Sequence, residues 1–205
     1  MRLPPTPSQT VGPYFGIALT PDSTDRYIAD GYPRPIALVG PTRLVDDRHP
    51  EAITLAGTVW DGAGQPVPEA MLEVWQADRY GRYHRPEDQS EQASLDEGFL
   101  GFGRCHTTDE GRYEFLTVKP GRVPAVGGGM QAPHINLAIF GGGLLKPLRT
   151  RIYFSDEAEA NAEDPTLASI DDGKRRSLLV AQIAGRIASF DIYLHSDSET
   201  PFFDI

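Results

Sequence analysis

Residues 130–140 carry the side chains of this sequence that are best placed to do chemistry. His134 and Asn136 stand two residues apart, so in a β-strand they share one face while the apolar residues between them take the other. Two imidazoles at this spacing could bind one metal ion, but here the second is replaced by a neutral amide, a weak ligand for ferric iron. The pair is therefore either part of a metal site or a hydrogen-bonded pair at the edge of the core. The residues alone favour the second interpretation.

Other potential metal ligands precede this stretch in the chain. A working ferric site needs about three or four protein ligands, and phenolate and imidazole groups suit this hard ion. The side chains that a β-sandwich could bring near His134 are Tyr80, Tyr83, His84 and His106.

Nucleophilic catalysis and phosphate binding have weaker support. Cys105 is the only cysteine and is adjacent to His106, so on a strand the two side chains face opposite ways and do not form a thiolate–imidazole pair. We expect Cys105 to be a buried structural residue. A single cysteine also excludes an intrachain disulfide and fits a reducing cytoplasm. The glycine runs at 127–129 and 141–143 lack the Lys-Ser/Thr pair and the helix of a phosphate-binding loop.

The composition is that of an acidic globular protein. The 205 residues suit one domain with a substantial core. The formal charge of −10 argues against a nucleic-acid partner, which needs a basic face. The chain starts with prolines instead of an apolar signal sequence, and no segment approaches the length of a membrane span. We therefore expect a cytoplasmic protein without a membrane partner.

The 21 glycines and 18 prolines favour a β-rich fold with many turns. We expect residues 1–52 to form an irregular N-terminal arm and assembly segment, and residues 53–205 to form a β-sandwich domain. Two short helices are expected, one capped by Asp156 and ended by Pro165, and one at 175–183. Besides the strand within 130–140, the predicted strands are 53–60, 70–77, 99–106, 112–118, 149–154 and 186–194.

Seven short motifs, each weak alone, follow one another over nearly the whole chain. They lie at residues 7–14 (PSQTVGPY), 57–62 (GTVWDG), 72–78 (LEVWQAD), 81–83 (GRY), 111–115 (GRYEF), 118–121 (VKPG) and 133–135 (PHI). In this order they resemble the intradiol ring-cleavage dioxygenases. The resemblance implies a mainly β fold, the intradiol dioxygenase-type β-sandwich with an irregular N-terminal arm and short helices. It also implies an oxidoreductase of aromatic catabolism.

Enzymes of this family hold a ferric ion with two tyrosines and two histidines. Tyr83 and His134 match one tyrosine and one histidine of that set. Val123, or Arg122 after a one-residue slip, stands where the second tyrosine belongs, and Asn136 replaces the second histidine. The resemblance therefore implies vestigial metal-site positions, no metal bound by this chain and no catalytic residue in it.

The role implied by the resemblance is that of a partner subunit. It would pair with a β chain of the same enzyme that carries the ferric ion, Fe(3+), in an α–β hetero-oligomer. Its N-terminal arm would then line the substrate pocket at the shared interface, where 3,4-dihydroxybenzoate reacts with O2. Carried over by position, the lining residues are Thr10, Gly12, Pro13 and Tyr14. A rigid Gly-Pro backbone and an aromatic ring can hold a planar catechol and exclude water.

One position departs from the family pattern. The arginine that helps to bind the substrate carboxylate is replaced here by Gly142. The nearest arginine along the chain is Arg149, so Lys146 or a residue of the partner chain would have to substitute.

Two alternatives remain open at this point. The chain could be a self-sufficient ferric dioxygenase in which Tyr80, His84 or His106 completes the iron ligands. It could also be a transthyretin-like binding module, because strand motifs such as the one at 57–62 occur widely in such modules.

Overall fold

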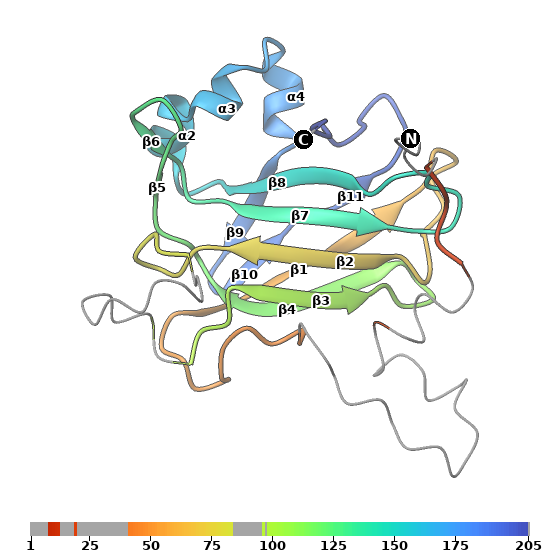
Figure 1. The fold of residues 1–205 in the computed structure, drawn as a ribbon, viewed down its shortest axis with the longest axis horizontal. Helices are drawn as coiled ribbons and strands as arrows, with labels where there is room; N and C mark the ends of the chain where they lie inside the picture. Colours follow the sequence, from red (N-terminus) through yellow and green to blue (C-terminus); the bar gives the residue numbers. More distant parts are fainter. Residues whose placement is uncertain (1–7, 13–18, 20–40, 84–95, 97, 205) are drawn as a thin grey trace, which may run out of the picture.

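A computed structural model describes residues 8–12, 19, 41–83, 96 and 98–204, and these residues form a mainly β structure of two layers (Figure 1). The first layer has the strand order β3–β2–β7–β8. The second layer has the order β4–β1–β10–β9, with β11 continuing beside the end of β1. Strands β8 and β9 pair in parallel and join the two layers along one side, so that the sheet is nearly closed. The predicted fold class is confirmed.

The bounds of the strands follow the predicted ones closely in the first half of the domain. The strands of the first layer are β2 (Met71–Gln76), β3 (Phe102–His106), β7 (Ile135–Phe140) and β8 (Leu148–Phe154). Those of the second layer are β1 (Ala52–Trp60), β4 (Arg112–Val118), β9 (Val180–Ala184), β10 (Ile187–Ser189) and β11 (Ile192–Tyr193). A separate two-stranded ribbon is formed by β5 (Val123–Pro124) and β6 (Met130–Gln131).

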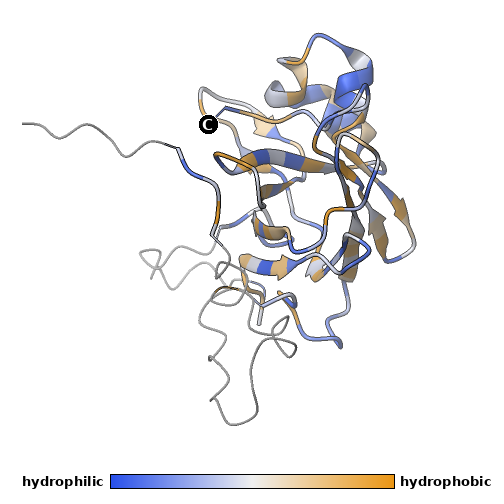
Figure 2. Ribbon diagram, turned by 90° about the vertical axis from the view of Figure 1, so that its right-hand side faces the viewer, coloured by the Kyte–Doolittle hydropathy of each residue, from blue (hydrophilic) through white to orange (hydrophobic). Residues whose placement is uncertain are grey.

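The core lies between the two layers. Along β7, Ile135, Leu137 and Ile139 are buried and the residues between them are partly exposed, as the alternation predicts. Hydrophobic and hydrophilic residues alternate along several strands in the same way (Figure 2). Leu55 of β1 and Phe115 of β4 bring the facing layer into the same cluster. Burial of these side chains is the main favourable contribution to folding.

Three short helices lie together beside β6, β8 and the C-terminal end of the chain (Figure 1). They are α2 (Ala158–Glu163), α3 (Pro165–Ala168) and α4 (Gly173–Ser177). The prediction that Asp156 caps the first helix is wrong. Glu157 takes the N-cap position without a side-chain hydrogen bond, and Asp156 pairs with Lys119 at 2.9 Å. Pro165 ends this helix as predicted and also begins the next, because a proline at the first helical position loses no hydrogen bond.

The prediction of a helix at 175–183 is also wrong. Helix α4 ends at Ser177, and the chain then enters β9. Tertiary pairing decides the outcome here, because β9 forms ladders with both β8 and β10. The single strand predicted at 186–194 is divided into β10 and β11 around Phe190.

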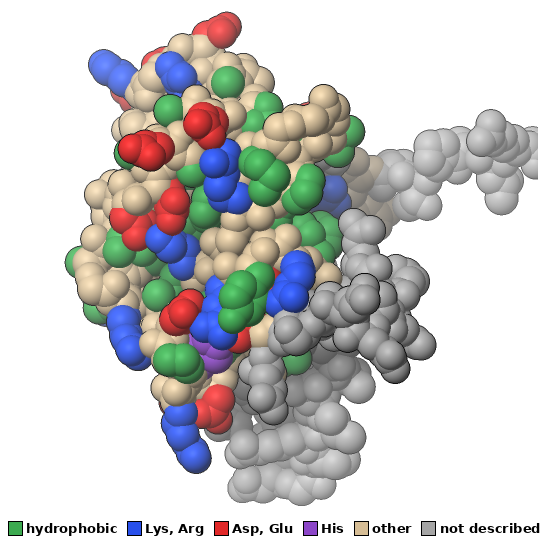
Figure 3. Space-filling model, turned by 90° about the vertical axis from the view of Figure 1, so that its left-hand side faces the viewer, with side chains coloured by type: hydrophobic (Ala, Val, Ile, Leu, Met, Phe, Trp, Pro, Cys, Tyr) green, Lys and Arg blue, Asp and Glu red, His purple; other side chains and the backbone are tan. Residues whose placement is uncertain are grey.

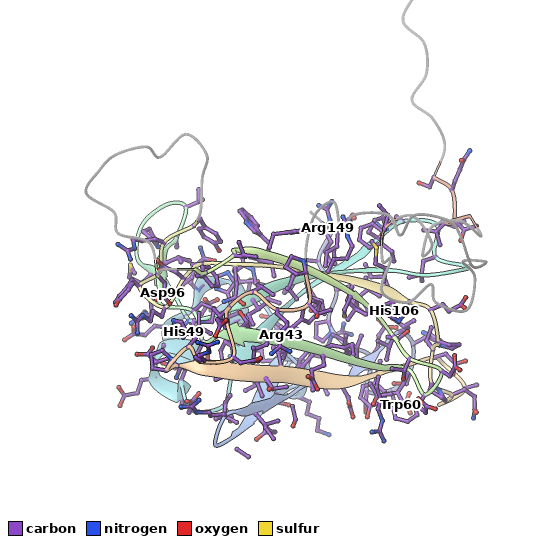
Figure 4. The ribbon with its side chains drawn as sticks, turned by 90° about the horizontal axis from the view of Figure 1, so that it is seen from below. Arg43, His49, Trp60, Asp96, His106 and Arg149 are labelled. Atoms are coloured by element: carbon purple, nitrogen blue, oxygen red, sulfur yellow. The ribbon has the colours of Figure 1, made fainter. Side chains whose placement is uncertain are left out.

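The last part of the predicted N-terminal arm already contacts the sandwich. Leu44 and Val45 are buried in the main core, and the Leu44 N–H donates to the Leu116 carbonyl at 2.7 Å. His49 Nε2 lies 3.2 Å from Asp96 Oδ1 (Figure 4). The division of the chain at residue 52 stays a prediction, since most of the arm lies outside the described residues.

Gly57 in β1 provides a direct test of how closely the second layer is packed. A Cβ at this position would lie 1.8 Å from the Phe190 carbonyl oxygen, which also accepts a hydrogen bond from the Tyr113 hydroxyl at 2.5 Å. Gly57→Ala should therefore lower the free energy of unfolding by about 1–3 kcal/mol in urea denaturation. Gly142→Ala is the matched control, because no atom lies within 4 Å of the added Cβ. Equal urea midpoints of unfolding for Gly57→Ala and Gly142→Ala would contradict the close contact between Gly57 and Phe190.

Candidate functional site

The centre of the candidate site is a row of side chains across the outer face of the first layer. Asn136 of β7 is the register partner of Trp75 on β2 and of Arg151 on β8. Directly opposed residues in an antiparallel sheet point to the same face, so these three side chains stand side by side. The Asn136 amide donates to the Trp75 carbonyl at 3.1 Å. Asn136 therefore braces the sheet and presents no negative charge to a cation.

A buried carboxylate shapes the turn that leads to Tyr83. Asp78 is fully buried, and its Oδ1 accepts from the backbone N–H groups of Tyr80 and Arg82 at 2.9 Å each. Its carbonyl oxygen accepts from the N–H groups of Gly81 at 3.0 Å and Gly121 at 2.9 Å. One residue thus closes the turn and fastens it to the loop before β5.

Gly81 is required at this contact. It has a φ of +77°, and a Cβ would lie 2.0 Å from the carbonyl oxygen of Arg122. Beyond this turn the Tyr83 ring packs on the Trp75 ring, with 4.7 Å between the centroids. Since Trp75 stands beside Asn136, the turn places Tyr83 at the same end of the sheet.

Val123 belongs to the β5–β6 ribbon, opposite Gln131. Its side chain is 3% exposed and purely aliphatic, so it cannot serve as a ligand. The position that the motif series assigned to a second phenolate therefore carries a buried hydrocarbon group.

His134 lies just before β7 and is 3% exposed. Its Nδ1 is 2.8 Å from the Ala132 carbonyl oxygen, and because a carbonyl only accepts, Nδ1 carries the proton. Burial, together with the positive charge of Arg151, lowers the pKa of His134 to about 4. The imidazole is therefore neutral at pH 7. His134 is therefore a hydrogen-bonded histidine at the edge of the core, which is the interpretation that the residues alone favoured.

Two residues that the sequence reasoning missed complete the surroundings of His134. The Tyr153 ring lies 5.8 Å from the imidazole, and its hydroxyl donates to Asp164 Oδ1 at 3.1 Å. Burial raises the pKa of Tyr153 to about 12, so the phenol stays protonated. Arg151 contributes a permanent positive charge to the same place. The signal for both was present, since they alternate along 149–154 and so share the face of the strand opposite to the core.

These residues do not fit a ferric ion. Of the four positions Tyr83, Val123, His134 and Asn136, only the first and third carry side chains of the family's ligand types. Across the described ranges no three His, Cys, Asp or Glu side chains come together in a way that could hold a metal ion.

Of the residues considered for a self-sufficient iron site, His106 lies far from this place. His106 is paired with Met71, five positions along β2 from the pair of Gln76 with Ile135. At roughly 3.3 Å per residue this displaces His106 by about 16 Å along the strand direction from the start of β7, and it is also two strands away across the sheet. Tyr80 is 59% exposed, and the guanidinium groups of Arg79 and Arg82 each lie 4.7 Å from the centre of its ring. His84 lies outside the described residues.

The N-terminal arm touches the loop that follows β7. Thr10 Oγ1 accepts a hydrogen bond from the Gly143 N–H at 2.8 Å. Gly12 is exposed, and Pro13 and Tyr14 lie outside the described residues. The described part of the arm is therefore held beside residues 141–143, the glycine run that follows β7. Lys146, the possible substitute, pairs with Asp204 at 2.7 Å.

A cavity elsewhere on the described surface has its cationic side chains paired with other groups. This open cavity lies at the start of β1 and is lined by four cationic side chains, each of which has a partner. Three form ion pairs: Arg79 with Glu51, Lys119 with Asp156 and Glu157, and Arg122 with Glu163. The fourth, Arg186, donates to the Pro50 carbonyl. Basic and acidic side chains are correspondingly intermixed in Figure 3. Cys105 is buried, which raises its thiol pKa and confirms a structural role. No helix within the described ranges is long and apolar enough to cross a membrane.

Comparisons with known proteins agree with the motif series. A protein-family model described as "Dioxygenase" matches residues 37–195. The chain is 41% identical to the protocatechuate 3,4-dioxygenase alpha chain of Pseudomonas putida over 207 residues, covering 98% of this chain and 97% of that one. It is 40% identical to the protocatechuate 3,4-dioxygenase beta chain of Burkholderia cepacia over 131 residues, covering 63% of this chain and 55% of that one.

The structural comparison gives the same fold. Catechol 1,2-dioxygenase from Pseudomonas arvilla C-1 superposes with a TM-score of 0.56 at 21% identity, over 76% of this chain and 58% of that one. The family model covers most of the chain, and the alpha-chain relative covers nearly all of it. The chain therefore belongs to the intradiol ring-cleavage dioxygenases, an iron-dependent family of oxidoreductases, and is similar over nearly its whole length to protocatechuate 3,4-dioxygenase alpha chains.

Proposed function

We propose that this chain is the non-catalytic α subunit of a protocatechuate 3,4-dioxygenase. The observation that carries the proposal is that Val123 and Asn136 stand at two of the four ligand positions in a chain that otherwise resembles such α chains along its whole length. A β subunit would hold the ferric ion, and its relation to the present chain is supported by the likeness to a beta chain. The α–β pair would act in aromatic catabolism, in the β-ketoadipate pathway.

The reaction of the pair is intradiol cleavage. The carbon–carbon bond between the two hydroxyl-bearing carbons of 3,4-dihydroxybenzoate breaks, and both atoms of O2 enter the product, 3-carboxy-cis,cis-muconate. The present chain supplies no acid, base or metal to this step. Its contribution is to shape the pocket and to exclude water from it.

The N-terminal arm is the part of the chain assigned to this contribution. Thr10, Gly12, Pro13 and Tyr14 would line the pocket at the α–β interface. The hydrogen bond between Thr10 and Gly143 supports the assignment, because it holds the arm against the loop that carries the other substrate-binding position of the family. The two segments are far apart in the sequence, so their contact is a property of the fold.

The iron content of the isolated chain and of the complex tests the proposal. The chain produced alone should contain no stoichiometric iron and show no tyrosinate-to-iron absorption band. Produced together with a β-type chain, it should co-purify with that chain, and the complex should contain one ferric ion per α–β pair. The proposal would be wrong if the isolated chain bound iron one-to-one or cleaved the aromatic ring.

Thr10→Val tests the role of the arm. The substitution removes one hydrogen bond, worth about 0.5–1.5 kcal/mol, so the KM of the α–β enzyme for 3,4-dihydroxybenzoate should rise about 2- to 10-fold while iron content is unchanged. Deletion of residues 1–14 should give a larger increase. Ser177→Ala, which removes an exposed hydroxyl hydrogen bond on α4, is the control and should leave KM unaltered. Normal kinetics after the deletion would refute an active-site role.

A further inference from the structure

Arg151 stands among the positions assigned to the lost metal. It is the register partner of Asn136 across the β7–β8 ladder. Its Nη1 lies 2.6 Å from the Gln131 Oε1 atom, and Gln131 is in turn the partner of Val123 in the β5–β6 ribbon. The Arg151 guanidinium thus lies beside Asn136 on the sheet and contacts Gln131, the register partner of Val123.

The same guanidinium also reaches the histidine side of the site. Arg151 Nη1 lies 3.5 Å from the Tyr153 hydroxyl, whose ring stacks near His134. A third contact, 2.9 Å to Thr166 Oγ1, anchors the nitrogen to the start of α3. Three oxygen atoms, from β6, β8 and α3, hold the guanidinium in this position.

The acceptors around Arg151 are neutral. Gln131, Thr166 and Tyr153 supply amide and hydroxyl oxygens, and within the described part of the chain no carboxylate forms an ion pair with this guanidinium. The nearby Asp164 carboxylate is occupied by the Tyr153 hydroxyl and by the backbone N–H groups of Ala132, Thr166 and Leu167. These donors are neutral, so Asp164 keeps its negative charge and partly offsets that of Arg151, but among the described residues no carboxylate pairs directly with the guanidinium. An arginine does not lose its proton in proteins, so no change of pH removes the charge of Arg151.

We propose that Arg151 is a metal-excluding residue, which keeps a ferric ion out of this position independently of the ligands lost at residues 123 and 136. The inference deepens the proposed function and rests on it, since it takes Tyr83, Val123, His134 and Asn136 as former ligand positions. A trivalent cation placed among them would meet a fixed like charge in a partly buried setting, where screening by water is weak.

The test restores the ligands and varies the charge. The full-length chain carrying Val123→Tyr and Asn136→His is titrated with ferric ion, alone and with Arg151→Gln added. Gln keeps a polar group able to contact Gln131 and Thr166 but removes the charge. The variant with Arg151→Gln should bind ferric ion about 10- to 100-fold more tightly and develop a tyrosinate-to-iron absorption band.

Arg149→Gln, added to the same two substitutions, is the matched control. Arg149 is two residues earlier on β8 and on the same outer face, so the same charge is removed about 7 Å away. It should leave ferric affinity at the level of the doubly substituted chain. An equal rise with Arg149→Gln would overturn the specific role of Arg151.

A second pair of variants covers the risk that tyrosine does not fit at buried Val123. The comparison is repeated with Asn136→His alone, with and without Arg151→Gln, and folding of each variant is checked by thermal unfolding. Ferric affinity is again expected to be higher in the variant that carries Arg151→Gln. Equal ferric affinity with and without Arg151→Gln in folded variants would overturn the proposal. Iron bound by the unsubstituted chain would instead contradict the proposed function, so the two failures are distinguishable.

Discussion

The register of the β2–β7–β8 ladders is the constraint on which the site depends. It aligns Trp75, Asn136 and Arg151 in one row, and by alternation it sends Ile135 and Leu137 into the core. A slip by one residue would turn the polar row inward and expose the apolar one, which the closed core does not permit. The chemistry of the outer face and the stability of the core are thus set by the same pairings.

Within this frame the groups near His134 offer few ligands to a cation and include the positive charge of Arg151. Asp78 closes the turn before Tyr83, and His134 is buried and neutral. An amide that braces the neighbouring strand, an aliphatic side chain and a guanidinium held by neutral oxygens now occupy the surroundings. We interpret this as a scaffold retained for assembly after its metal chemistry passed to a partner.

Much of this could be predicted from the sequence, for reasons tied to particular residues. Alternation in β7 and the motif positions are local patterns, so the strand and the β-rich fold could be predicted directly. The assignment of Val123 and Asn136 to lost ligand positions comes from the motif series and stays a prediction. The helix expected at 175–183 was wrong because pairing with β8 and β10 outweighs local propensity in β9. The contacts of Arg151 with Gln131 and of Thr10 with Gly143 join segments that are distant in the sequence, so no local sequence pattern could predict them.

The central claim is that this chain shapes a site whose iron belongs to its partner. Anomalous X-ray diffraction at the iron absorption edge, on crystals of the α–β complex, tests it most directly. The account predicts one iron peak per α–β pair, coordinated by β-chain residues, with Thr10 to Tyr14 of this chain facing the same pocket. A peak between Tyr83 and His134 of this chain would contradict it.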